Sequence, residues 1–106
     1  MIGDDSIEGT VIYIDTYGNL VSSIGGAEWQ EFLVHANGDL TEMVAEVDRV
    51  IVPVVTTFGD VPEDDGCAYV GSTGRIEVAV NLGSAAKRFG ASIGSPVRLK
   101  RISQEM

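Results

Sequence analysis

The stretch that decides the fold is STGRIEVAVNLGSAA, residues 72–86. It opens on a turn signal at 72–74 and continues into Arg75–Val80, whose alternating pattern is typical of a β-strand. The strand stops at Asn81, and the small residues 83–86 then begin a short helix. An asparagine at the end of an apolar strand is not explained by folding alone. Its side-chain amide both donates and accepts hydrogen bonds and therefore needs partners. The stretch therefore predicts a strand whose end borders a binding site.

A second stretch, IDTYGN at residues 14–19, breaks in the same way. An apolar strand runs into Asp15, and Tyr17, Gly18 and Asn19 follow with the composition of a turn. Two strands that each stop at an asparagine, beside small or aromatic residues, indicate a rim that holds a ligand.

Short alternating or β-branched segments recur along the rest of the chain, separated by turn residues at regular spacing. Strands are expected over residues 7–14, 20–24, 41–47, 50–55, 67–71, 75–80 and 97–102. The segment 50–55 is apolar throughout, as in a central strand, although Pro53 is typical of a bulge or an edge. Asn37-Gly38 is a strong turn signal.

Two segments have helical rather than strand character. Trp29, Phe32 and Leu33 recur at helical spacing and predict a helix over 27–33. A second helix is expected over 83–89, with Gly90 as its C-cap. Six or seven short strands with two short helices predict a mainly β protein, a small closed or nearly closed β-barrel. A length of 106 residues fits one domain over 1–106 with a modest core.

Composition and charge limit the function classes. The net charge is −9, and residues 1–65 carry fourteen acidic residues against one arginine. So acidic a surface argues against general nucleic-acid binding, because it repels phosphate. No apolar run reaches the ~20 residues of a membrane span, and residues 1–5 lack the basic and apolar parts of a signal peptide. The single Cys67, expected as a buried structural thiol, fits a reducing compartment, and we expect a cytoplasmic protein.

Several kinds of catalytic site are not indicated by the sequence. His35 is the only histidine and has no nucleophile motif around it. The acidic loop with Asp60 and residues 63–65 has no calcium-loop spacing, and solvated loop charges are the simpler interpretation. No phosphate loop or dinucleotide fingerprint is present. We therefore predict no metal site and no bound cofactor.

Three residues form a candidate binding pattern. Asp15 could accept hydrogen bonds from hydroxyls or an amino group, and the Asn19 amide could bind the edge of a base. Phe58 could stack on a planar ring. The alternative is ordinary structure, with Asp15 and Asn19 as turn residues and Phe58 in the core. Spacing alone favours that alternative.

Three motifs resemble one family. They are IDTYGN followed by LVSSI, then TTFGDVP, then GSTGRIEVAVNLGSAAKRFGASIGSPV. In this order, over about residues 9–99, they look like the C-terminal domain of the S-adenosylmethionine hydroxide adenosyltransferases, which are relatives of the fluorinating and chlorinating enzymes. The resemblance implies a small Greek-key-like β-barrel, and for the whole enzyme a homotrimer that binds substrate between domains of neighbouring subunits.

The resemblance also implies a role for eight residues of this chain. Asp15 would meet the amino-acid end of S-adenosylmethionine, and Asn19 would hydrogen-bond the adenine edge. The aromatic residues among them would pack near the adenosine, two hydroxyl residues would lie at the methionine carboxylate, and two residues beside Asn81 would offer backbone groups to adenine. These three pairs are, respectively, Tyr17 with Phe58, Ser72 with Thr73, and Val80 with Leu82.

The chain departs from the family in two places. The first strand pair ends on Ser22-Ser23-Ile24 where the family usually has Thr-Asn-Ile. The N-terminal domain, which holds the residues that handle water or halide, is absent from these 106 residues. We therefore expect an adenosine- or S-adenosylmethionine-binding domain of a SAM hydrolase, inactive alone and completed by an N-terminal catalytic domain in the same or a separate chain. The alternative is a non-catalytic interaction or oligomerisation module with a vestigial pocket.

Overall fold

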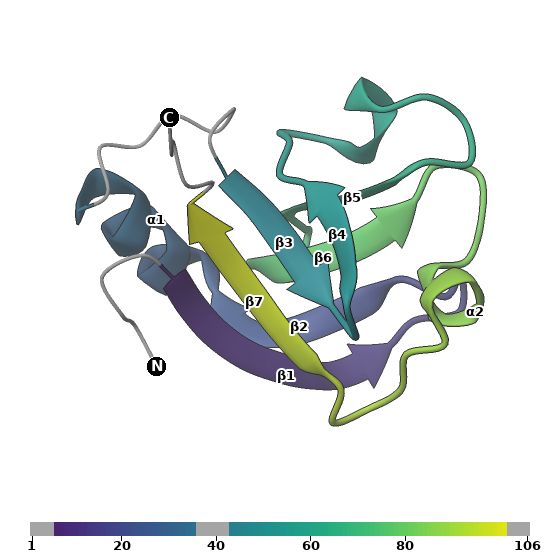
Figure 1. The fold of residues 1–106 in the computed structure, drawn as a ribbon, viewed down its shortest axis with the longest axis horizontal. Helices are drawn as coiled ribbons and strands as arrows, with labels where there is room; N and C mark the ends of the chain where they lie inside the picture. The colour runs from purple at the N-terminus through teal and green to yellow at the C-terminus, as the bar shows by residue number, and fades with distance from the viewer. Residues whose placement is uncertain (1–5, 36–42, 102–106) are drawn as a thin grey trace.

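The computed structural model describes residues 6–35 and 43–101. Within them the chain forms seven strands, two α-helices and one short 3-10 helix (Figure 1). In chain order these are β1 (Ser6–Ile14), β2 (Leu20–Gly25), α1 (Gly26–His35), β3 (Met43–Val47), β4 (Val50–Pro53), η2 (Phe58–Asp60), β5 (Gly66–Val70), β6 (Arg75–Val80), α2 (Ala85–Phe89) and β7 (Pro96–Arg101). The predicted mainly β fold is confirmed. The turn expected at Asn37-Gly38 lies outside the described residues.

All seven strands belong to one antiparallel sheet, in the order β4-β3-β7-β1-β2-β6-β5. Figure 1 shows this sheet curling on itself, so that its two ends approach each other. A single bridge joins them just past β4, where the Val55 amide donates to the Ala68 carbonyl at 2.8 Å. The sheet is therefore a nearly closed barrel, as predicted.

The segment 50–55 differs from its expected position. Its β-branched, apolar run was typical of a central strand, but β4 is the first strand of the sheet order and pairs along its length only with β3. Pro53, which lacks a backbone donor, ends the strand. The segment is apolar because the curled barrel buries Val52 and Val54 from this edge, so the proline, and not the composition, indicated the position.

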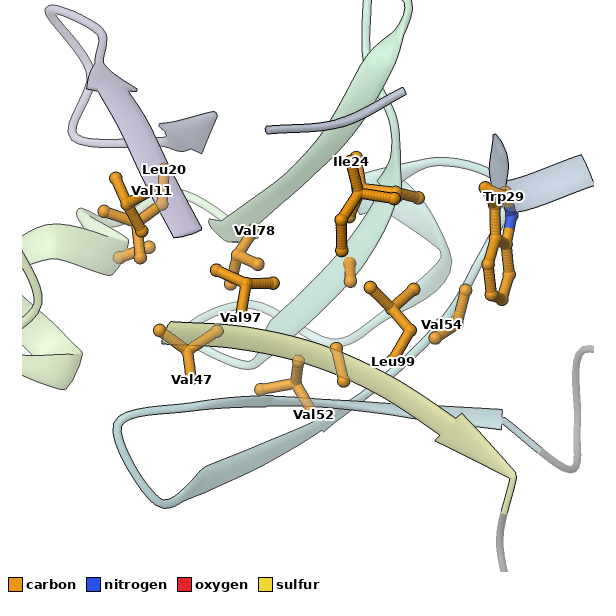
Figure 2. Close-up of a cluster of buried hydrophobic side chains, with 14 of the residues drawn as sticks. Val11, Leu20, Ile24, Trp29, Val47, Val52, Val54, Val78, Val97 and Leu99 are labelled. Atoms are coloured by element: carbon orange, nitrogen blue, oxygen red, sulfur yellow. The ribbon is translucent and has the colours of Figure 1, made fainter. Parts of the chain in front are cut away.

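The core fills the inside of the barrel (Figure 2). Alternate residues of each strand point inward, among them Val11, Leu20, Val78 and Leu99, each at most 1% exposed. Helix α1 packs its apolar face against the barrel. Its Trp29 and Phe32 rings stack with centroids 5.8 Å apart, which explains their helical spacing in the sequence.

The stretch 72–86 lies at the middle of this arrangement. β6 runs between β2 and β5, with Ile76, Val78 and Val80 in the core and the alternate residues on the opposite face. Ser84 caps α2, accepting a hydrogen bond from the Lys87 amide at 3.3 Å. Gly90 closes the helix with φ 65°, so the predicted C-cap is confirmed.

Asn81 has a structural task at the end of β6. Its side-chain amide donates to the Val61 carbonyl at 2.8 Å. Its backbone exchanges hydrogen bonds with the loop, accepting from the Asp64 amide and donating to the Asp65 carbonyl. Asn81 therefore fixes the 61–65 loop beside the barrel, which accounts for an asparagine at the strand end without a ligand.

None of the helices within residues 6–35 and 43–101 has the length and apolar composition needed to cross a membrane.

Candidate functional site

A pocket of about 790 Å³ opens where four connections of the barrel meet. These are the β1–β2 turn, the segment between β4 and η2, the β5–β6 turn and the segment that leads from β6 to α2. Six of the eight residues expected at the site line this pocket: Asp15, Tyr17, Asn19, Ser72, Val80 and Leu82. The fold thus brings together residues up to 67 positions apart, from Asp15 to Leu82.

The other two expected residues lie elsewhere. Thr73 is exposed and does not line the pocket, but its hydroxyl donates to Oε2 of the pocket residue Glu77 at 3.2 Å. Phe58 begins the short helix η2, and its side chain lies outside the described part of the structure. Its neighbours Thr56 and Thr57 do line the pocket.

The β1–β2 turn is held together by Asp15. One carboxylate oxygen accepts the backbone amides of Tyr17 and Asn19, at 2.9 and 3.0 Å. The other accepts the Asn19 side-chain amide at 3.2 Å. Gly18 adopts φ 85° within this turn, and its carbonyl accepts the Ala86 amide of α2 at 2.9 Å. Asp15 and Asn19 therefore act as turn residues and also line the pocket.

The segment after β6, which packs against the β1–β2 turn, also lines the pocket. The Val80 carbonyl accepts the Gly83 amide at 3.0 Å, which turns the chain back at Leu82. Leu82 has φ 60°, a conformation uncommon for a branched side chain, and is 75% exposed. Tyr17 is 78% exposed. Two large and mostly exposed side chains, Tyr17 and Leu82, thus line the pocket.

Sequence reasoning missed the floor of the pocket, which is built from Tyr69 on β5 and Glu77 on β6. They are direct cross-strand partners, and Glu77 is only 5% exposed. Burial, and then the negative charge of Glu77, raise the pKa of the Tyr69 phenol above its ordinary value of 10.0. The alternation placed Glu77 on the face opposite the core, which in a barrel strand is usually the solvent face. No local signal distinguishes that face from a pocket floor.

Gly71 lets the β5–β6 turn close over this floor. A Cβ at position 71 would lie 2.1 Å from the Glu77 carboxylate, so a larger residue there would displace the carboxylate from its present position. The Gly71 amide and carbonyl both hydrogen-bond within the turn, to Arg75 and Gly74. The turn that carries Ser72 and the carboxylate beneath it therefore pack as one unit.

Cys67 lies on the same face of β5 as Tyr69. It is fully buried, as the sequence predicted for a structural thiol. Burial, assisted by the charge of Asp60, raises the pKa of the thiol from 9.0 to about 11. Across the part of the chain that the structure describes, no three His, Cys, Asp or Glu residues are grouped to hold a metal ion.

The fold and the pocket together define a class of protein, a small antiparallel β-barrel with a ligand-sized pocket among its loops. The model of the SAM hydroxide adenosyltransferase C-terminal domain matches residues 9–98. The chain therefore belongs to that domain family. The resemblance seen in the three sequence motifs is confirmed, and a stand-alone interaction module is not favoured.

Two curated relatives are similar over most of this chain. An (R)-S-adenosyl-L-methionine hydrolase from Thermus thermophilus is 41% identical over 92 residues, which are 87% of this chain and 31% of that protein. A protein of the same name from Salinispora tropica is 32% identical over 98 residues, 90% of this chain and 33% of its own length. The chain thus spans about a third of the length of these relatives.

Solved structures show the same fold. An uncharacterized conserved protein from Thermotoga maritima superposes with a TM-score of 0.78 at 28% identity, over 94% of this chain and 38% of that one. A conserved hypothetical protein from Thermus thermophilus gives a TM-score of 0.67 at 39% identity, over 87% of this chain and 34% of its own.

Proposed function

We propose that this domain binds the adenosine part of S-adenosylmethionine and forms one wall of the active site of a SAM hydrolase. The observation that carries the proposal is the pocket, where residues from all three family motifs converge on one space. Its volume of about 790 Å³ lies within the range of small-molecule sites. Tyr17 and Leu82 offer apolar surface to a planar base, and Ser72 offers a hydroxyl to the amino-acid end.

The proposed chemistry divides between two domains. Water attacks the 5′ carbon of the ribose, the carbon–sulfur bond breaks with its electron pair going to sulfur, and the water loses a proton. The products are adenosine and methionine. This domain holds and orients the substrate, and an N-terminal domain, in the same or a separate chain, handles the water. A homotrimer in the cytoplasm is the proposed state of the complete enzyme.

The first test is a titration of the ¹⁵N-labelled domain with adenosine or S-adenosylmethionine. At ligand concentrations up to about 10 mM, amide shifts are expected in residues 15–19, 69–72 and 80–83. Neither ligand should be hydrolysed by the domain alone. Absence of shifts with both ligands, or shifts confined to another face, would contradict the proposal.

Replacing Tyr17 with alanine gives a sharper test. The ring is 78% exposed, so folding should be little affected. Loss of aromatic packing should weaken adenosine binding roughly threefold to tenfold. Tyr13→Ala is the matched control, because Tyr13 is also exposed, at 55%, but does not line the pocket. Equal affinities for the two variants would show that the base does not lie against Tyr17.

A further inference from the structure

Glu77 is a buried carboxylate that faces the proposed binding pocket. Its side chain is 5% exposed and lines the pocket floor, between Val21 of β2 and Tyr69 of β5. Oε2 accepts the Thr73 hydroxyl at 3.2 Å. No fully buried side-chain oxygen in the described residues lacks a hydrogen-bond partner. Because Glu77 lines the pocket, a ligand bound there can donate to this carboxylate.

The lining of the pocket offers no cation that could compensate this charge. It includes two carboxylates, Asp15 and Glu77, and no lysine or arginine among the described residues. The ion pairs found among residues 6–35 and 43–101 join Arg98 to Glu8 and Lys100 to Glu46, on other strands. A carboxylate removed from water is costly unless it is paired. The pocket thus places a negative charge where a positive group of a ligand would be stabilised.

The two carboxylates are not equivalent. Asp15 already accepts three hydrogen bonds from its own turn, from the Tyr17 amide and from both nitrogens of Asn19. Glu77 accepts the Thr73 hydroxyl, a neutral donor. Asp15 is also half-buried at the rim, whereas Glu77 lies at the floor, where the local dielectric is lower and a charge interaction is stronger. Glu77 is the carboxylate better placed to bind a cation.

We infer that Glu77 is a specificity residue that binds the positive group of the ligand, the ammonium or the sulfonium, and makes the pocket selective for cationic adenosine derivatives. The inference rests on the proposed function and adds a reason why the pocket would distinguish ligands of different charge. S-adenosylmethionine carries a net positive charge, adenosine carries none, and adenosine monophosphate is an anion. The pocket attracts the first, is indifferent to the second and repels the third. The neutral product adenosine would then leave more easily than the substrate.

The test compares affinities of this chain for ligands of different charge by NMR titration. S-adenosylmethionine should bind about tenfold or more tightly than adenosine, and adenosine monophosphate more weakly than either. S-adenosylhomocysteine keeps the ammonium without the sulfonium, and 5′-dimethylsulfonioadenosine keeps the sulfonium without the amino acid. Whichever of these two retains the preference over adenosine identifies the group that Glu77 meets.

The decisive variant is Glu77→Gln, which keeps the size of the side chain and an oxygen for the Thr73 hydroxyl. It should remove about tenfold of the preference for S-adenosylmethionine over adenosine, while the affinity for adenosine stays within about twofold. Glu31→Gln, an exposed change of the same charge on α1, is the control and should leave both affinities unaltered. If Glu77 had only a structural role, the variant would bind both ligands more weakly and the ratio of the two affinities would be unchanged.

The outcomes separate this inference from the proposed function. If adenosine binds in the pocket but the ratio of affinities is the same in the parent chain and in Glu77→Gln, the inference is wrong and the proposed function stands. Equal binding of adenosine monophosphate and adenosine would also overturn it. If neither adenosine nor S-adenosylmethionine shifts any pocket amide, both fail. A Glu77→Gln spectrum that matches the parent outside residues 69–77 establishes that the variant is folded.

Discussion

Replacing Gly18 with alanine is expected to lower the free energy of unfolding by about 3 kcal/mol. Gly18 has φ 85°, a conformation that costs an alanine roughly 1 kcal/mol. The added Cβ would lie 2.0 Å from Oγ and 3.1 Å from Cα of Ser84, the N-cap of α2. Relieving that contact moves the cap and weakens the hydrogen bond from the Ala86 amide to the Gly18 carbonyl. Each of these two losses costs about 1 kcal/mol.

Urea denaturation of the variant and the parent chain measures this effect. Gly59→Ala is the matched control, because a Cβ at that position meets nothing within 4 Å. We expect the control to remain within about 0.5 kcal/mol of the parent chain. A Gly18→Ala variant as stable as the control would show that the β1–β2 turn and α2 are not packed as described. The same variant should lose adenosine affinity, because that turn carries Asp15 and Asn19.

The Cys67 thiol is expected to react with a thiol reagent at least about a hundredfold more slowly in the folded chain than in the urea-unfolded chain at pH 8. Burial raises its pKa from 9.0 to about 11, so the folded protein holds far less thiolate, and the sulfur is fully buried as well. Labelling rates followed by mass spectrometry test this. A folded rate within tenfold of the unfolded rate would contradict the burial of β5.

The same raised pKa predicts an alkaline loss of stability. A thiol that keeps its proton in the folded state favours folding below the unfolded pKa of about 9, and that contribution is lost as the pH rises toward 11. The expected loss is on the order of 2 kcal/mol. Tyr69, whose pKa is also raised, adds to it at the upper end of the range. In Cys67→Ala the decline between pH 9 and 11 should be shallower, whatever the stability of that variant at pH 7. An unchanged slope would show that the Cys67 thiol does not contribute to the decline.

Local patterns predicted most of the fold. Alternating or β-branched apolar segments between turn residues located all seven strands that the structure describes. The spacing of Trp29 and Phe32 located α1, and Gly90 marked the end of α2. The position of β4 was not predictable in the same way. Its apolar run suggested a central strand, but in this edge strand Val52 is buried while Ile51 is 58% exposed.

The candidate site was predictable from the sequence only in part. The two turn motifs predicted part of its rim, because each places hydrogen-bonding side chains beside small or aromatic residues at the end of an apolar strand. Spacing alone also favoured Asp15 and Asn19 as turn residues, and the structure shows that they hold the turn together and line the pocket as well. The side-chain amide of Asn81 needs a hydrogen-bond partner, which suggested a ligand, but the partner is the Val61 carbonyl, 20 residues away. A side-chain amide in a sequence shows that a partner is needed and not which one.

The sequence by itself determined the strands, the helix ends, the family motifs and the acidic charge of this protein, because each follows from residues close together in the chain. Only the tertiary structure decided that Glu77 is buried. Its alternation in β6 fits a solvent face equally well, and the neighbours that cover it come from other places: Val21 from β2, Tyr69 from β5 and Gly71 from the turn. Whether a charged side chain is buried depends on the residues that the fold places over it, and its neighbours in the sequence do not indicate which residues those are.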